Sequence, residues 1–178
     1  MRICIFSAGI MESHLVLERL IPQYSQDIVA LCLSKGGIGP KKKSTIHLIR
    51  EFFRKAGLSY VMYHVFEGLS FPLARLMKKF KGKPLPKTCT EVAKDYGIEI
   101  IEAEDINHPD MVKKIAELKP DLILSVYFDR ILKKPILEIP SLGCVNVHPS
   151  LLPDFRGFNP LFWALRMGKK RWAHRSIT

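Results

Sequence analysis

Two side chains suited to acyl-transfer chemistry stand two residues apart near the C-terminal end of the chain. The segment CVNVH carries Asn146 and His148 in an otherwise apolar run and leads into PSLLP. Side chains of a strand alternate between its faces, so both groups are expected on one face. An amide donates hydrogen bonds to a polarised carbonyl oxygen, and an imidazole moves protons near neutral pH. The spacing therefore predicts a pair that assists acyl transfer.

Each residue also has an ordinary structural explanation. His148 fits a histidine that is satisfied at a strand end, and Asn146 fits a turn former. Together, inside an apolar strand, they favour a site, because Asn146 is then expected to be a buried polar group that needs a partner.

The elements that must position this pair alternate between strands and helices. Strands are expected at 2–6, 28–33, 98–101, 121–127 and 144–148, and a sixth begins within 171–178. Helices are expected at 12–20 (ended by Pro22), from Ser44 or Thr45 to 56, and at 88–96, 109–118 and 160–167, the last capped by Asn159. This order predicts an α/β, Rossmann-like, mostly parallel sheet with helices on both faces, truncated after the start of its sixth strand. Ligands of such sheets bind outside the carboxyl ends of the strands, where His148 is expected.

The segment from 40 to 90 is long for one crossover and is interpreted as a helical insertion in a single domain that spans 1–178. Its stretch 58–80 is strongly apolar but is interrupted by His64, Glu67, Pro72 and Arg75, so no membrane span is expected. One or two helices that pack on the core or on a partner chain are expected there, with a homo-oligomer as one outcome. A helix lying on a membrane surface is the alternative.

Composition narrows the class of protein. The 178 residues are 47% hydrophobic and 25% charged, which is typical of one globular domain. Four cysteines without a C-x-x-C pair, and a start without a signal-peptide pattern, indicate a cytoplasmic protein with reduced thiols and no metal site. The formal net charge of +11 suggests an anionic ligand, such as a phosphorylated substrate, a folate tail or RNA. No nucleic-acid-binding module is recognisable.

The run N-x-H-P-S-L-L-P followed by R-G, which begins at Asn146, resembles the signature of the folate-dependent formyltransferases. Upstream, the tripeptide Arg130 to Leu132 is similar to the R-I-L that lines the folate pocket of glycinamide ribonucleotide formyltransferase. The stretches KGKPLPKTCTEVAKDYGIEI and PILEIPSLGCVNVH resemble the methionyl-tRNA enzyme. The resemblance covers 81–168, and the N-terminal half resembles the family only in its expected fold.

The resemblance implies the reaction and the residues that serve it. An acceptor amine takes the formyl group of 10-formyltetrahydrofolate, with no metal, in one-carbon metabolism. The acceptor is a small molecule, such as a sugar nucleotide, or a tRNA. Asn146 and His148 are implied as the catalytic pair. The implied folate-binding residues are Arg130, Ile131, Leu132, Leu137, Ser150, Leu151, Leu152 and Pro153, although core packing explains Ile131, Leu132 and Leu137 equally well.

The chain departs from the family pattern at three places. No residue matches the family's catalytic aspartate, so weak turnover is expected from this chain. Asp129 stands where the glycinamide enzyme has an apolar residue before R-I-L, and SAGIMES after the first strand is neither a dinucleotide fingerprint nor that enzyme's phosphate loop. A non-catalytic folate-binding or assembly module and a formyltetrahydrofolate hydrolase-type fragment are therefore the alternatives.

Overall fold

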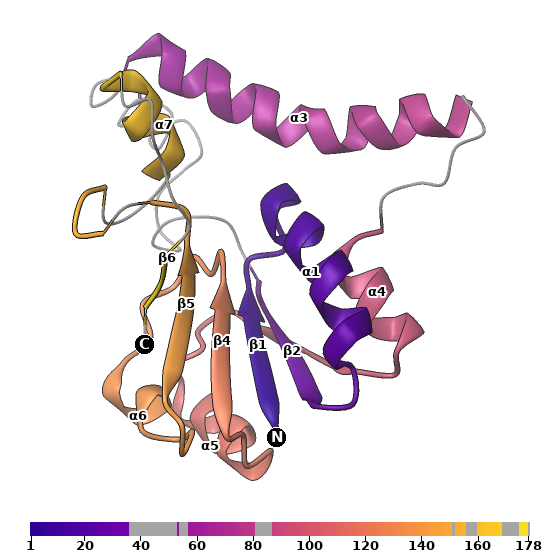
Figure 1. Ribbon diagram of the computed structural model, residues 1–178, viewed down its shortest axis with the longest axis vertical. Coiled ribbons are helices and arrows are strands. Elements are labelled where there is room, and N and C mark those ends of the chain that lie inside the picture. The colour runs from indigo at the N-terminus through magenta and orange to yellow at the C-terminus, as the bar shows by residue number, and fades with distance from the viewer. Residues whose placement is uncertain are drawn as a thin grey trace. The chain divides into compact units, whose positions relative to one another are not determined.

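The computed structural model describes residues 1–35, 53, 57–80, 87–150, 152–155, 160–168 and 175–177 (Figure 1). The chain divides into two compact units, which are described separately. One comprises Met1–Lys35 and Lys87–Thr178, and the other comprises Gly36–Pro86. The predicted helix from Ser44 or Thr45, the Asn159 cap and Leu151 lie outside the described residues. Whether 40–90 is an insertion stays a prediction.

The first unit is built on a six-stranded sheet in the order β3-β2-β1-β4-β5-β6. Strands β1 to β5 pair in parallel, and β6 pairs antiparallel with β5. The strands are β1 (Ile3–Ser7), β2 (Ile28–Ser34), β3 (Glu99–Ala103), β4 (Leu122–Val126), β5 (Cys144–His148) and β6 (Arg175–Ile177). The order of the five parallel strands, with its reversal between β1 and β4, confirms the predicted Rossmann-like fold.

Helices cover both faces of this sheet because its strands are apolar on both sides. The helices of this unit are α1 (Met11–Tyr24), α4 (Cys89–Asp95), α5 (Pro109–Glu117), α6 (Lys134–Leu137) and α7 (Pro160–Arg166). On one face, Leu17 of α1 and Val92 of α4 pack with Ile5 and Val126 in a first core cluster. On the other face, Ile115 of α5 and Ile136 of α6 pack with Phe6 in a second cluster. Full burial of such side chains contributes roughly 1.5–3 kcal/mol each.

Helix α1 is longer than the sequence predicted. The expected end before Pro22 is wrong, because the helix continues through Pro22 to Tyr24. Pro22 cannot donate to the Glu18 carbonyl oxygen and its ring crowds that carbonyl, a cost of roughly 3 kcal/mol. Burial of the fully enclosed Leu17 and Ile21, roughly 1.5–3 kcal/mol each, offsets this cost. Helix α4 follows the prediction more closely, with Thr88 as its N-cap and with Gly97 at a φ of 67° just after it.

The second unit contains α3 (Leu58–Phe80), a single helix of 23 residues that includes Pro72. The sequence had left one or two helices open for this segment. Among the residues that the structure describes, no helix is long and apolar enough to cross a membrane.

Candidate functional site

The carboxyl ends of β4 and β5 bring most of the predicted site residues to one edge of the sheet. The two strands are parallel neighbours, with Val126 opposite Val147, so the loops that follow them leave from the same edge. One loop carries Arg130, Ile131 and Leu132, and the other follows His148 directly. Chain topology therefore brings together segments that lie about twenty residues apart in the sequence.

The alternation of β5 places Asn146 and His148 on the face covered by α5 and α6. Cys144 packs against the second core cluster, which contains Ile136, whereas Val147 packs against the first. Positions 146 and 148 share the side of Cys144. The Arg130–Leu132 loop leads to the same face, because Leu132 also packs against the second cluster.

Asn146 is exposed, and the expectation that it is a buried polar group was wrong. Its strand is flanked by β4 on one side and by the short β6 on the other, where Asn146 lies opposite Ser125 and Ile177 respectively. An exposed amide can form hydrogen bonds with a ligand, because its donor and acceptor groups are accessible from solvent. Ser125, which is only 7% exposed, is a polar neighbour in this register that the sequence analysis did not single out.

His148 is half-buried and is held by the loop that follows it. Its Nε2 lies 3.2 Å from the carbonyl oxygen of Phe155. A carbonyl oxygen can only accept, so Nε2–H donates in this contact, and the neutral ring keeps a lone pair on Nδ1. The loop therefore fixes both the orientation and the tautomer of the imidazole.

The same loop is tied to itself through Ser150, which is 2% exposed. The Ser150 backbone N–H donates to the His148 carbonyl oxygen at 2.9 Å, and its hydroxyl donates to the Asp154 carbonyl oxygen at 3.2 Å. Leu152 is half-buried and Pro153 is exposed. Ser150 thus shapes the loop from inside, while Pro153 lies on its surface.

Backbone strain is concentrated at this edge. Three described non-glycine residues have positive φ, and two of them are Tyr127 (50°), directly after β4, and Phe155 (53°). The Ala8 backbone N–H donates to the Tyr127 carbonyl oxygen at 3.2 Å and helps to hold that turn. Burial, reinforced by the Glu12 carboxylate, raises the pKa of Tyr127. Strained residues of this kind tend to gather at functional sites.

The Arg130–Leu132 loop is anchored by Asn107, a residue that the sequence analysis missed. Its side-chain N–H donates to the Ile131 carbonyl oxygen at 2.9 Å, and its Oδ1 accepts from the Lys133 backbone N–H at 2.8 Å. Asn107 comes shortly before α5, and the sequence marks it only as a turn former. Nothing in the pattern reveals that it reaches a segment 24 residues further along.

With its backbone fixed in this way, the loop presents Ile131 to solvent. Ile131 is 85% exposed, so core packing does not explain it, whereas Leu132 is half-buried against the second cluster. Leu137 ends α6 and is 44% exposed. Figure 1 shows α6 beside the beginning of β5, so sheet topology alone does not bring Leu137 to the edge where His148 lies.

The departure at Asp129 produces a local ion pair. The Asp129 side chain is 9% exposed, and its Oδ1 lies 3.6 Å from Nε of Arg130, whose side chain is 24% exposed. Within the described part of the chain, that carboxylate oxygen accepts no hydrogen bond. The pair balances two opposite charges where the family resemblance led us to expect an apolar residue.

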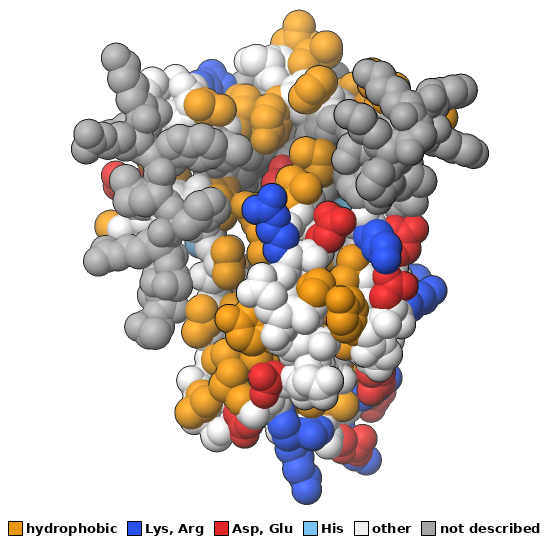
Figure 2. Space-filling model, turned by 45° about the vertical axis from the view of Figure 1, so that its right-hand side comes forward, with side chains coloured by type: hydrophobic (Ala, Val, Ile, Leu, Met, Phe, Trp, Pro, Cys, Tyr) orange, Lys and Arg blue, Asp and Glu red, His pale blue; other side chains and the backbone are white. Residues whose placement is uncertain are grey.

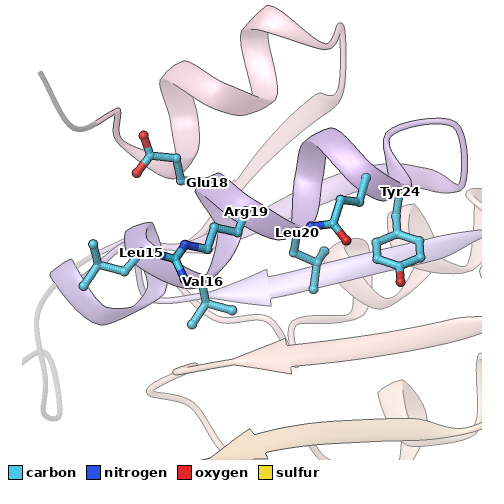
Figure 3. Close-up of a pocket in the computed structure, with 7 residues that line it drawn as sticks. Leu15, Val16, Glu18, Arg19, Leu20 and Tyr24 are labelled. Atoms are coloured by element: carbon cyan, nitrogen blue, oxygen red, sulfur yellow. The ribbon is translucent and has the colours of Figure 1, made fainter. Parts of the chain in front are cut away.

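A separate hollow of about 580 Å³ runs along α1. Figure 3 shows its lining, which includes Leu15, Val16, Leu20 and Tyr24 with Glu18 and Arg19 beside them. The lining residues in the described part of the chain all belong to α1, so among them no second element contributes a converging polar group. We therefore place the candidate site at the carboxyl ends of β4 and β5.

Comparison with known proteins gives a consistent result. The family model described as formyl transferase matches residues 75–173. A methionyl-tRNA formyltransferase from Kosmotoga olearia is 42% identical over 93 residues, which are 52% of this chain and 30% of that protein. The methionyl-tRNA formyltransferase of Bacillus subtilis is 40% identical over 86 residues, which are 48% and 27% of the two chains. The matched region is thus less than a third of these relatives.

Solved structures share the fold across the whole chain. Glycinamide ribonucleotide transformylase 1 from Symbiobacterium toebii has a TM-score of 0.57 at 14% identity, and the superposition covers 100% of this chain and 66% of the transformylase chain. Phosphoribosylglycinamide formyltransferase from Bacillus halodurans has a TM-score of 0.56 at 16% identity, covering 100% and 80%. At this identity the likeness shows the fold alone.

Proposed function

Because the chain belongs to the formyl transferase family, we propose that it transfers a formyl group from 10-formyltetrahydrofolate to an amine of an acceptor. The acceptor would be a sugar nucleotide, a methionyl-tRNA or a similar amine. The observation that carries the proposal is topological: the Asn146 and His148 positions and the anchored Arg130–Leu132 loop share one edge and one face of the sheet. A donor and an acceptor that meet at this edge would both lie within reach of the pair.

The residues at this edge fit a reduced folate. The loop backbone between Arg130 and Leu132 is held by Asn107 and offers peptide groups in a fixed place, as recognition of a pterin ring requires. Ile131 supplies an exposed apolar side chain beside them. Leu152 and Pro153 would form the opposite wall, which Ser150 would shape from inside the loop, and Leu151 and Leu137 remain predicted contacts. The formyl donor supplies an activated carbonyl carbon when it is bound.

The two polar side chains have complementary tasks in this chemistry. The exposed amide of Asn146 would donate to the formyl oxygen as negative charge develops there, and loss of such a donor typically costs 10²–10³ in rate. The lone pair on Nδ1 of His148 would take the proton that the attacking amine must release. His148 would then return that proton to the departing folate nitrogen. The bond between the formyl carbon and the acceptor nitrogen forms, and the bond between the formyl carbon and the folate nitrogen breaks.

A non-catalytic folate-binding module is the second candidate. The observation that favours it is that Nε2 of His148 and the Ser150 hydroxyl are already engaged by loop carbonyl oxygens. Such a module would bind a reduced folate without turnover. A hydrolase-type fragment would use water in place of the amine.

Binding and turnover are measured separately to distinguish these candidates. Calorimetry with 5-formyltetrahydrofolate measures binding, and transfer of a labelled formyl group to an amino-sugar nucleotide, to methionyl-tRNA or to water measures turnover. His148→Gln keeps an N–H that can reach the Phe155 carbonyl oxygen but moves no proton. We expect it to lower turnover 10²–10⁴-fold while folate binding changes less than about twofold.

The wild-type outcomes decide between the candidates. Binding without detectable turnover supports the module. Weak turnover that His148→Gln lowers further supports formyl transfer and agrees with the weak turnover expected from the sequence. Formyl release into water supports the hydrolase. No binding of the folate, or full activity of His148→Gln, contradicts the proposed function.

A further inference from the structure

Helix α3 carries an apolar stripe that is open to solvent. Hydrophobic side chains recur every three or four residues along it, which places them on one side of the helix. Each is between 49% and 71% exposed, and hydrophobic surface of this kind is visible in Figure 2. We call this set the α3 stripe: Met62, Val65, Phe66, Leu69, Leu73 and Leu76.

Five of the six residues of the α3 stripe are spaced symmetrically about Leu69, and the counterpart of the sixth, Phe66, is Pro72. Met62 and Leu76 lie seven residues on either side of it, and Val65 and Leu73 lie four residues on either side. A two-fold interface requires that residue i of one copy meets residue j of the other, and that j meets i in return. Two antiparallel copies of α3 satisfy this requirement, with Leu69 on the axis and apolar side chains paired on both sides.

The charges of α3 favour the antiparallel arrangement. Its basic residues, Arg75, Lys78 and Lys79, fall in the last two turns. A parallel pair would place two such groups together. In an antiparallel pair centred on Leu69 they are separated by about 24 Å of helix, well beyond the screening length of about 8 Å at physiological salt.

The same distribution of charge favours a second copy over a lipid surface. A helix that lies on a membrane usually carries Lys and Arg along its polar face. In α3, positions 58–74 contain neither residue. Attraction to anionic lipid headgroups is therefore confined to one end of the helix.

The exposed apolar area is large enough for association. The α3 stripe and its flanking apolar residues present on the order of 800 Å², about what each partner of a standard-size interface buries. The largest apolar patch on a typical monomer is roughly 300–600 Å². From the exposure, the symmetric spacing and the charge distribution, we infer that α3 is a two-fold, antiparallel association surface for a second copy of this chain. This inference goes beyond the proposed function and does not depend on it.

The test is the molar mass of the full 178-residue chain, measured by sedimentation equilibrium at several concentrations. Leu69→Glu places two like charges on the symmetry axis and removes two buried leucines, so the dimer dissociation constant should rise at least about 100-fold. Leu69→Met keeps the apolar volume and should dimerise like the wild type. Leu15→Glu on α1 is the matched control, because Leu15 is also about half exposed (51%), and it should leave the dimer intact.

The orientation is tested with one introduced cysteine per chain, beside the four native cysteines, three of which are buried. In an antiparallel pair, a mixture of Met62→Cys and Leu76→Cys chains cross-links with a short bis-maleimide, whereas Met62→Cys by itself does not. Cross-linking of Met62→Cys with itself would overturn the antiparallel arrangement. A wild-type chain that is monomeric at about 200 µM, where a dimer with a micromolar Kd would predominate, would overturn the inference, as would dissociation caused equally by Leu15→Glu. Wild-type binding to phosphatidylserine vesicles that Leu69→Glu abolishes, with no dimer in solution, would assign the stripe to lipid instead.

Discussion

Replacement of Asn107 by alanine tests how the candidate folate loop is held. The side chain of Asn107 connects the turn before α5 to both sides of Leu132, through the Ile131 carbonyl oxygen and the Lys133 backbone N–H. Alanine removes both contacts and adds no new volume. The backbone N–H of residue 107 still donates to Asp105 Oδ1, so the turn itself is retained.

The expected magnitude follows from the two hydrogen bonds. Each is well formed, at 2.9 Å and 2.8 Å, and both are solvent-accessible, so each contributes toward the lower part of the usual range of roughly 0.5–1.5 kcal/mol. Asn107→Ala should therefore lower the free energy of unfolding by about 1–2 kcal/mol. Folate binding should weaken about 5–30-fold, because the ligand must then order the loop itself.

Urea denaturation measures the first effect, and calorimetry with 5-formyltetrahydrofolate measures the second. Asn107→Asp is the comparison variant: it keeps an acceptor for the Lys133 N–H but sets a carboxylate oxygen against the Ile131 carbonyl oxygen and against Asp105 Oδ1, which lies 3.5 Å from the side-chain amide nitrogen of Asn107. It should therefore destabilise the loop at least as much as alanine does. A change of stability below 0.3 kcal/mol (about the additivity error of such measurements) together with unchanged folate binding would refute the anchoring role.

Three further predictions concern a cap, a carboxylate and a thiol. Thr88→Ala removes the N-cap contact with the Glu91 backbone N–H at 3.1 Å and should cost about 1 kcal/mol in urea denaturation, whereas Thr88→Ser should cost little. The pKa of Asp105 is lowered, chiefly because the Asn107 backbone N–H donates to its carboxylate. The resulting stabilisation is present above the ordinary carboxylate pKa and is lost as pH falls through the lowered value. The Asn107 amide should therefore be least protected from hydrogen exchange at the acid end of a pH series, and unchanged protection there would contradict this. Burial raises the pKa of the half-buried Cys144, and the other three cysteines are buried, so native protein should react slowly with one equivalent of a thiol reagent, and fast reaction of two or more would count against it.

For the strands and most helices of the first unit, the predicted bounds lie close to the observed ones, because local sequence patterns encode these elements directly. Apolar runs such as IVALCL are buried on both faces, and the cap at Thr88 lies within four residues of the helix it begins. Pro22 is the exception. Its local effect opposes a helix, and the packing of Leu17 and Ile21, which depends on the whole sheet, outweighs it.

Only part of the candidate site could be predicted from local sequence patterns. Asn146 and His148 follow from the period of two of a strand, but the exposure of Asn146 depends on what packs over that face of the sheet, which the local pattern does not encode. The engagement of His148 by the Phe155 carbonyl oxygen depends on the path of the following loop. Asn107 and Ser125 were missed because their neighbours are distant in sequence.

The sequence alone determined the alternation of strands and helices, the same-face spacing of the amide and the imidazole, and the family signature, since each is written in contiguous residues. Tertiary structure alone decided that β4 and β5 are neighbours, that the Arg130–Leu132 loop and His148 leave from one edge, and that Asn107 holds that loop. The physical reason is that spacing along a chain sets which way a side chain points, whereas strand pairing and hydrogen bonds between distant segments set what it meets.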